Sequence, residues 1–178
     1  NDIPTKSYVD STGTHLLASS ATPVTITSAS SDVHVYSVAA GLLKTGDVIE
    51  ITLGGTMLND SGSNVDLGIK LYIGGSNLVM VDTMSGLTTN ANQRKWRSTI
   101  EVVVGSTLSS QSSSAVFHLS NGSTAGWATT GAVSVGSAAT NIDQSGAHDI
   151  KTVVTFSATD AATINLVLNS ATVKLHRA

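Results

Sequence analysis

The chain of 178 residues contains no cysteine, few charged residues and few aromatic ones. The absence of cysteine excludes disulfide bonds and thiolate metal sites, so packing alone must hold the fold together. Charged residues make up 12% of the chain, about half of the usual share in soluble proteins. Serine, threonine, glycine and alanine are abundant instead, which indicates a surface hydrated by hydroxyl groups more than by charges.

Basic residues and long apolar runs are also scarce. The nine lysines and arginines are scattered and the net charge is −3, so we expect no binding to nucleic acid, which needs clustered positive charge. The sequence has no run of 18 apolar residues and no apolar core of a signal peptide. We therefore expect neither a membrane span nor a secretory signal. A processed N-terminus and a trimmed chain explain equally well why the first residue is Asn1.

Residues 44–104 carry the clearest structural pattern. Within them, apolar residues occupy every second position of one stretch: Val65, Leu67, Ile69, Leu71 and Ile73. This period of two residues predicts a strand with one buried face. Gly74 and Gly75 follow it and favour a tight hairpin turn, so residues 78–81 are predicted to be its antiparallel partner.

The rest of the chain predicts more strands of the same kind. They are expected over residues 24–27, 33–38, 48–53, 96–104, 115–119, 132–135, 150–156, 164–168 and 171–175. Polar loops are expected over residues 56–64, 83–93 and 106–114, and no helical period persists. We therefore predict an all-β fold, an antiparallel β-sandwich of the jelly-roll type with two four-stranded sheets, which forms a single domain over residues 23–178.

Residues 1–22 are predicted to form an arm rather than a core element. Pro4 cannot donate a hydrogen bond within a sheet, and the apolar residues form short islands among polar ones. We expect this arm to pack on a neighbouring subunit. The candidate contact residues are Ile3, Tyr8, Val9, Leu16 and Leu17.

Residues 94–97 form the one basic cluster of the sequence, with a tryptophan inside it. Trp96 is in phase with the apolar positions of the strand that follows, which favours a core position for its ring and outward positions for Lys95 and Arg97. A binding patch for an anion is the alternative interpretation. His34 shares a strand face with Tyr36, and we expect it to point outward or to be hydrogen-bonded.

No pattern in the sequence marks a catalytic site. The nucleophile motif Gly-x-Ser-x-Gly is missing, and Glu50 and Glu101 lie on the polar faces of predicted strands, unlike the carboxylate pair of a glycosidase. The histidines lie too far apart in the sequence to predict a metal site within one chain: His15, His34, His118, His148 and His176. We expect a protein that is not an enzyme and that binds neither a cofactor nor a metal.

Two weaker candidates for binding remain. Asp60 and Asp66 carry carboxylates that Ca²⁺ accepts, but their spacing matches no EF-hand loop, so a solvated turn is the preferred interpretation. Trp127 lies among small residues. Its ring either packs half-buried or stacks on a sugar, which makes it the candidate residue for glycan stacking.

Several strand and turn patterns resemble those of a known group. Residues 46–49, 67–75, 96–97, 100–104, 115–117 and 164–168 are similar to segments of the jelly-roll accessory proteins of tailed bacteriophages, over about residues 41–175. The resemblance implies a structural virion protein on the particle surface, a capsid decoration or fibre subunit. It also implies a homotrimer whose partners are the major capsid protein or other virion proteins.

Two alternatives to a virion subunit stay open. A carbohydrate-binding jelly-roll module would recognise a glycan of the host surface, although exposed aromatic residues are expected in such a module and only 4% of this chain is aromatic. A trimeric ligand similar to a cytokine would share the fold but normally needs a secretory signal.

Overall fold

The computed structural model describes residues 13–27, 30–74, 78–120, 132–140, 143–158 and 163–178. These ranges contain strands and no helix, and every strand pairing is antiparallel. Within them, no helix of membrane-spanning length occurs. The strands are β1 (Gly13–Ser20), β2 (Val24–Ile26), β3 (Ser30–Val38), β4 (Val48–Asn59), β5 (Val65–Ile73), β6 (Leu78–Leu87), β7 (Asn90–Val104), β8 (Gln111–Leu119), β9 (Ala132–Thr140), β10 (His148–Phe156) and β11 (Ile164–Arg177).

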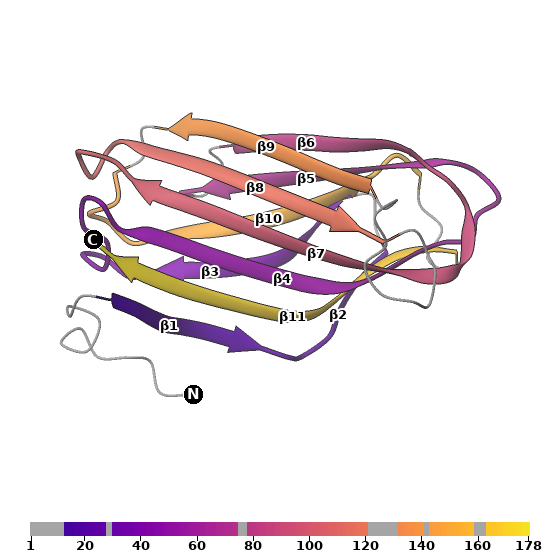
Figure 1. The fold of residues 1–178 in the computed structure, drawn as a ribbon, viewed down its shortest axis with the longest axis horizontal. Coiled ribbons are helices and arrows are strands. Elements are labelled where there is room, and N and C mark those ends of the chain that lie inside the picture. Colours follow the sequence, from indigo (N-terminus) through magenta and orange to yellow (C-terminus); the bar gives the residue numbers. More distant parts are fainter. Residues whose placement is uncertain (1–12, 28–29, 75–77, 121–131, 141–142, 159–162) are drawn as a thin grey trace.

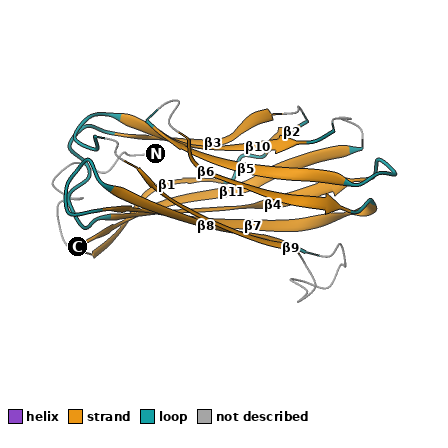
Figure 2. Ribbon diagram, turned by 90° about the horizontal axis from the view of Figure 1, so that it is seen from above, coloured by secondary structure: helices purple, strands orange, loops and turns teal. Residues whose placement is uncertain are grey.

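The strands form two sheets that pack face to face (Figures 1 and 2). The larger sheet has seven strands in the order β1-β11-β4-β7-β8-β9, with β2 also paired to β11, and the smaller has four in the order β3-β10-β5-β6. The predicted antiparallel sandwich of the jelly-roll type is confirmed. The prediction of two four-stranded sheets holds for the smaller sheet and is wrong for the larger one, in which β11, β4, β7, β8 and β9 are joined by β1 and β2 at one edge.

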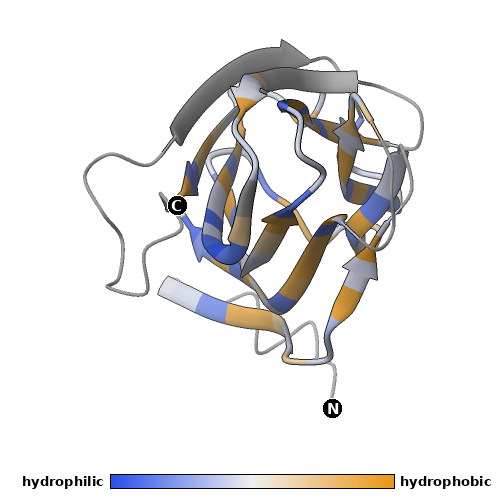
Figure 3. Ribbon diagram, turned by 90° about the vertical axis from the view of Figure 1, so that its right-hand side faces the viewer, coloured by the Kyte–Doolittle hydropathy of each residue, from blue (hydrophilic) through white to orange (hydrophobic). Residues whose placement is uncertain are grey.

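One hydrophobic core fills the space between the two sheets. Figure 3 shows apolar residues on the faces that the sheets turn toward each other. The five alternating residues of β5 are each at most 5% exposed, which confirms the buried face predicted from their period. They join side chains of the larger sheet, such as Ile49, Ile51 and Leu53, in a single cluster.

Three segments predicted as polar loops are shorter than expected because strands continue into them. β4 extends to Asn59, β6 and β7 take up most of residues 83–93, and β8 starts at Gln111. Polar side chains at these strand ends form hydrogen bonds inside the protein. The Asn59 amide donates to the Leu87 carbonyl at 2.9 Å, and the Gln111 amide donates to the Leu108 carbonyl at 2.8 Å. These bonds allow polar residues to be buried.

The predicted arm over residues 1–22 is corrected from Gly13 onward. Gly13–Ser20 is an edge strand of the domain and pairs with β11 from Arg177 to Ala171. His15 is buried and Leu17 packs against the core, whereas Leu16 is 54% exposed. The apolar island at residues 15–17 thus belongs to a strand of the domain. The other predicted contact residues, Ile3, Tyr8 and Val9, lie outside the described residues.

His34 lies on the inner side of the smaller sheet, in phase with Tyr36 and Val38 and next to a bulge in β3. Along β10, Thr152 pairs with His34 but Val153 pairs with Asp32, so β3 has one extra residue at this point. Val35 alternates with His34 and is 46% exposed on the opposite face, while burial lowers the pKa of His34. The expectation that His34 points outward or is hydrogen-bonded is wrong for its Nδ1, which is buried with no hydrogen-bond partner among the described residues.

Candidate functional site

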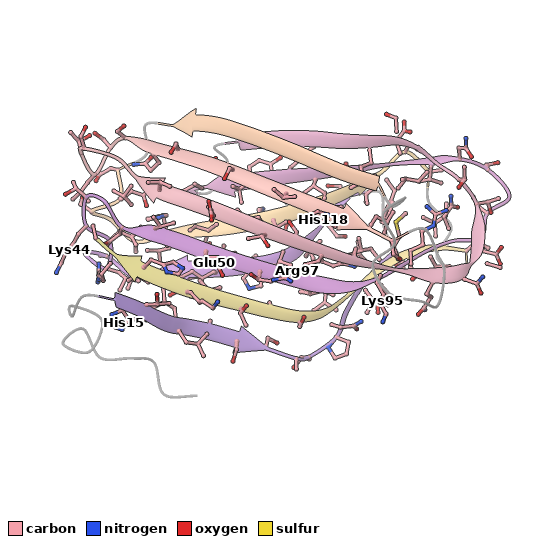
Figure 4. All side chains as sticks on the ribbon, in the orientation of Figure 1. His15, Lys44, Glu50, Lys95, Arg97 and His118 are labelled. Carbon is pink, nitrogen blue, oxygen red and sulfur yellow. The ribbon has the colours of Figure 1, made fainter. Side chains whose placement is uncertain are left out.

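A hollow of about 430 Å³ opens in the larger sheet, midway along β4, β7 and β11. Its volume lies in the range of ligand-binding clefts, roughly 300–1,000 Å³. Figure 4 shows the labelled side chains of Lys95 and Arg97 on this sheet. The residues that line the hollow are Thr52, Leu53, Gly54, Gly55, Thr56, Lys95, Trp96, Arg97, Asn169 and Ser170.

Two adjacent glycines of β4 make the floor of the hollow. A Cβ atom on Gly55 would lie 1.8 Å from the Val167 carbonyl oxygen and 2.9 Å from Nε1 of Trp96. Only glycine therefore fits at this close approach of β4 and β11. A Cβ atom on Gly54 would instead meet Oγ of Ser170 at 3.2 Å. The floor is therefore bare backbone that a ligand can approach closely.

A bulge in β11 provides one rim of the hollow. Leu168 pairs with Gly55 and Ser170 pairs with Gly54, which leaves Asn169 as an extra residue between them. Asn169 and Ser170 are both exposed. The bulge redirects these polar side chains beside the glycine floor, as bulges commonly do next to binding sites.

Trp96 holds the three strands of the hollow together from the core side. Its indole N–H donates to the carbonyl oxygens of Thr56 at 3.2 Å and of Val167 at 3.1 Å, and so ties β7 to β4 and β11. The ring stacks on Phe117 with 5.4 Å between the ring centres. Because Trp96 is only 2% exposed, the predicted core position of its ring is confirmed.

The two cations that flank Trp96 in the sequence lie on the outer face, as predicted. Lys95 and Arg97 are exposed, and neither has a carboxylate partner within the described part of the chain. Lys95 pairs with Thr56 and Arg97 with Gly54 across β4. Both cations therefore stand along the β7 side of the glycine floor.

Arg94, the third cation of the basic cluster, takes no part in the hollow. Its guanidinium donates to the Thr88 carbonyl oxygen at 2.8 Å and to the Thr88 hydroxyl at 3.0 Å. Burial lowers the pKa of Arg94. This residue thus closes the turn between β6 and β7, and the cluster is divided between a structural cation and two cations at the hollow.

The histidines do not converge on a metal site. His118 is exposed on β8, His148 lies 3.1 Å from the Gly146 carbonyl oxygen through its Nδ1, and His176 lies 3.5 Å from Glu50. In the described ranges, no group of three or more potential metal ligands occurs. The carboxylate of Asp66, a candidate Ca²⁺ ligand from the sequence, accepts a hydrogen bond from the Gly86 amide at 2.7 Å.

The sequence pattern predicts part of this site but not all of it. It places Lys95 and Arg97 outside and Trp96 inside, but it assigns no role to Gly54 and Gly55. The available signal was a pair of glycines in a strand pattern, which is typical of a bulge or a close backbone approach. Trp127, the predicted residue for glycan stacking, lies outside the described residues.

No family model and no curated protein matches this chain. Solved structures with some similarity include lectin I from Ulex europaeus in complex with the methyl glycoside of α-L-fucose. The match has 6% sequence identity and a TM-score of 0.31, and it covers 73% of this chain and 72% of the lectin chain. Peanut lectin with a 9-residue peptide matches at 8% identity and a TM-score of 0.28, over 89% of this chain and 97% of the lectin chain. The CBM2 module of the evolved Dit protein of Lactobacillus casei BL23 phage J-1 matches at 7% identity and a TM-score of 0.26, over 79% of this chain and 67% of that chain. Likeness at this level supports no inference about function.

Proposed function

We propose that the protein is a carbohydrate-binding β-sandwich module and that the hollow of the larger sheet holds a glycan. The observation that carries this proposal is the combination of a bare glycine floor with a ring of polar side chains. A saccharide presents many hydroxyl groups that both donate and accept hydrogen bonds. Threonine and serine hydroxyls and the asparagine amide have the same double capacity.

The hollow is suited to hold a flexible glycan because strands form it. Gly54 and Gly55 lie within β4, and Lys95 and Arg97 lie within β7. The Trp96 hydrogen bonds join these strands to β11, so the backbone of the floor is fixed before a ligand arrives. Such preorganisation reduces the entropy lost on binding.

A variant that fills the hollow tests the proposal. Valine at position 54 suits a strand and projects into the hollow, so Gly54→Val should remove binding on a glycan array while the folded state persists. Gly146→Val is the matched control. A Cβ atom there meets nothing within 4 Å, and the residue lies far from the hollow in the turn before β10.

The array separates three results. Binding by the unchanged chain and by Gly146→Val, but not by Gly54→Val, supports the hollow as the glycan site. Equal binding by all three chains places any glycan elsewhere and overturns the proposal for the hollow. Failure of the unchanged chain to bind any glycan on the array overturns the carbohydrate-binding function.

We propose a homo-oligomeric virion subunit as a second function, favoured by the apolar residues at one sheet edge. Leu16 and Val24, 54% and 40% exposed, lie on β1 and β2, which both pair with β11. Light scattering of the full chain should give the mass of a trimer, and Leu16→Lys should reduce it. Ser19→Lys, on the same strand, is the control. A monomeric mass for the unchanged chain would refute this second function.

A further inference from the structure

We infer that the glycan held by the hollow is acidic and that its carboxylate or sulfate groups bind to Lys95 and Arg97. This inference rests on the proposed carbohydrate-binding function and adds the chemical class of the ligand. It depends on the position of the two cations, on their lack of acidic partners in the described part of the chain and on the distance of the described glutamates on the same face.

The cations are placed to contact a ligand that lies on the glycine floor. Lys95 and Arg97 are two residues apart on β7, so they share the outer face at a spacing of about 7 Å. Arg97 pairs across the sheet with Gly54, and no side chain at that position stands between its guanidinium and the floor. The planar guanidinium suits bidentate contact with a carboxylate or a sulfate.

Three other cations of the described chain are neutralised by carboxylates. Lys151 forms an ion pair with Asp32 at 3.3 Å, Lys174 pairs with Glu50 at 3.2 Å, and Arg177 pairs with Asp47. Lys95 and Arg97 are exposed without such a partner in the described ranges. Their positive charge is thus available to a ligand.

Among the described residues, the two glutamates on the outer face of β4 and β7 lie too far away to repel an anion strongly. Glu50 and Glu101 are each four residues along their strands from Gly54 and Arg97, a distance of about 13 Å. The Debye length at physiological ionic strength is roughly 8 Å. Glu50 is in addition paired with Lys174 and His176, and Figure 4 shows it toward the other end of the sheet from Lys95.

The residue beside Arg97 on its other side is also compatible with an anion. His118 of β8 pairs directly with Arg97 and is exposed. An exposed imidazole can donate a hydrogen bond to a carboxylate or a sulfate. Two cations and one histidine form a small patch rather than the long basic surface that binds nucleic acid, so the hollow favours a saccharide with spaced acidic groups.

The test compares acidic saccharides with uncharged counterparts on the full chain. Oligogalacturonate is paired with its methyl ester, and dextran sulfate is paired with dextran, while inorganic polyphosphate serves as an acid without sugar. The variant Lys95→Gln/Arg97→Gln removes both cations. Lys44→Gln/Lys70→Gln removes the same net charge away from the hollow and is the control.

We expect at least one acidic saccharide to bind about tenfold or more tightly than its uncharged counterpart, because hydrogen bonds to charged groups are the stronger kind. Lys95→Gln/Arg97→Gln and Gly54→Val should each reduce that affinity about tenfold or more, and the control should not. Added salt should weaken binding. The ratio between the two acidic saccharides then identifies carboxylate or sulfate as the preferred group.

Three other results would overturn the inference in distinguishable ways. In the first, uncharged saccharides bind as tightly as acidic ones, and Gly54→Val loses this binding whereas Lys95→Gln/Arg97→Gln keeps it. That result supports the glycan site but refutes its preference for acidic saccharides. Polyphosphate that binds as tightly as the acidic saccharides, unaffected by Gly54→Val, identifies a general anion patch and refutes the inference, while the glycan array still decides the proposed function. Absence of binding to every probe refutes the inference, and the glycan array then decides the proposed function separately.

Discussion

Gly54 and Gly55 are neighbours in β4 whose side-chain positions point to opposite faces of the larger sheet. Position 54 faces the hollow, where a methyl group meets one serine hydroxyl at 3.2 Å. Position 55 faces a carbonyl oxygen of β11 and the indole of Trp96. The same substitution should therefore have different effects at the two positions.

We expect Gly55→Ala to lower the free energy of unfolding by about 1–3 kcal/mol, because β4 and β11 must move apart to admit the methyl group. That movement also strains the two hydrogen bonds of the Trp96 indole. Gly54→Ala should stay within about 0.5 kcal/mol of the unchanged chain. Urea unfolding of the two variants measures both effects, and equal midpoints would contradict this account of the close approach.

Trp96→Ala should lower the free energy of unfolding by about 3–5 kcal/mol. The substitution removes a buried ring, its stacking on Phe117 and two hydrogen bonds that join three strands. Lys95→Ala, one residue away and exposed, is the control and should cost little. If thermal melts show equally small losses for both, Trp96 does not anchor the hollow.

His34 should make stability depend on pH below neutrality. Burial lowers the pKa of His34 from its ordinary value of 6.5, so the unfolded chain binds a proton in a range where the folded chain does not. The free energy of unfolding must then fall as the pH decreases from 6.5 toward the folded pKa. His34→Phe should flatten this part of the profile in urea unfolding at a series of pH values. An unchanged slope in the variant would show that His34 does not contribute.

At the scale of elements, the sequence predicts best the strands whose two faces differ most. The alternation in β5 predicts its buried face correctly because one face of this strand packs against the core between the two sheets. The same pattern does not predict the end of β4 or the start of β8, since Asn59 and Gln111 are polar and their burial depends on carbonyl groups beyond the strand itself. Local polarity alone does not reveal such partners.

The hollow could not be predicted from the sequence for a related reason. Its floor depends on Val167 lying against Gly55 and on Trp96 bonding to a carbonyl 71 positions away. The bulge at Asn169 sets the register between β11 and β4, and no local pattern marks it. The sequence indicated which side chains face outward, but only the pairing of distant strands brings them to one place.

Hydrogen exchange should locate the start of β8. This strand lies between β7 and β9, so its amides are bonded to neighbours on both sides. We expect slow exchange from Ser112 onward, comparable with the central amides of β5, and fast exchange over residues 106–109. Fast exchange through Ser114 would restore the longer polar loop predicted from the sequence.

At the scale of the whole molecule, the last strand completes the larger sheet. β11 pairs with β4 along most of its length and also with β1 and β2, the first strands of the described chain (Figure 1). Beside it, Arg177 and Asp47 form a buried ion pair at the start of β4. Segments far apart in the sequence must therefore meet before this sheet is complete, a topology typical of slow folding.

The contribution of β1 can be measured by comparing a chain that starts at Gly13 with one that starts at Pro23. The shorter chain lacks β1, and so it loses the burial of His15 and the packing of Leu17. Partial burial of one leucine contributes up to about 2 kcal/mol. Loss of β1 also leaves the backbone groups of β11 from Ala171 to Arg177 unpaired at a new sheet edge. Exposed edges of this kind template pairing with other chains.

We therefore expect the chain that starts at Pro23 to have a lower melting temperature and to self-associate in light scattering. The chain that starts at Gly13 is its control, because it keeps every residue of β1. Val173→Lys would not isolate the contribution of β1, since Val173 is itself buried and its replacement disturbs the core. The comparison of the two chain lengths avoids this problem. Identical melting and scattering of the two chains would mean that β1 adds no stability, and would favour the arm over residues 1–22 that the sequence predicts.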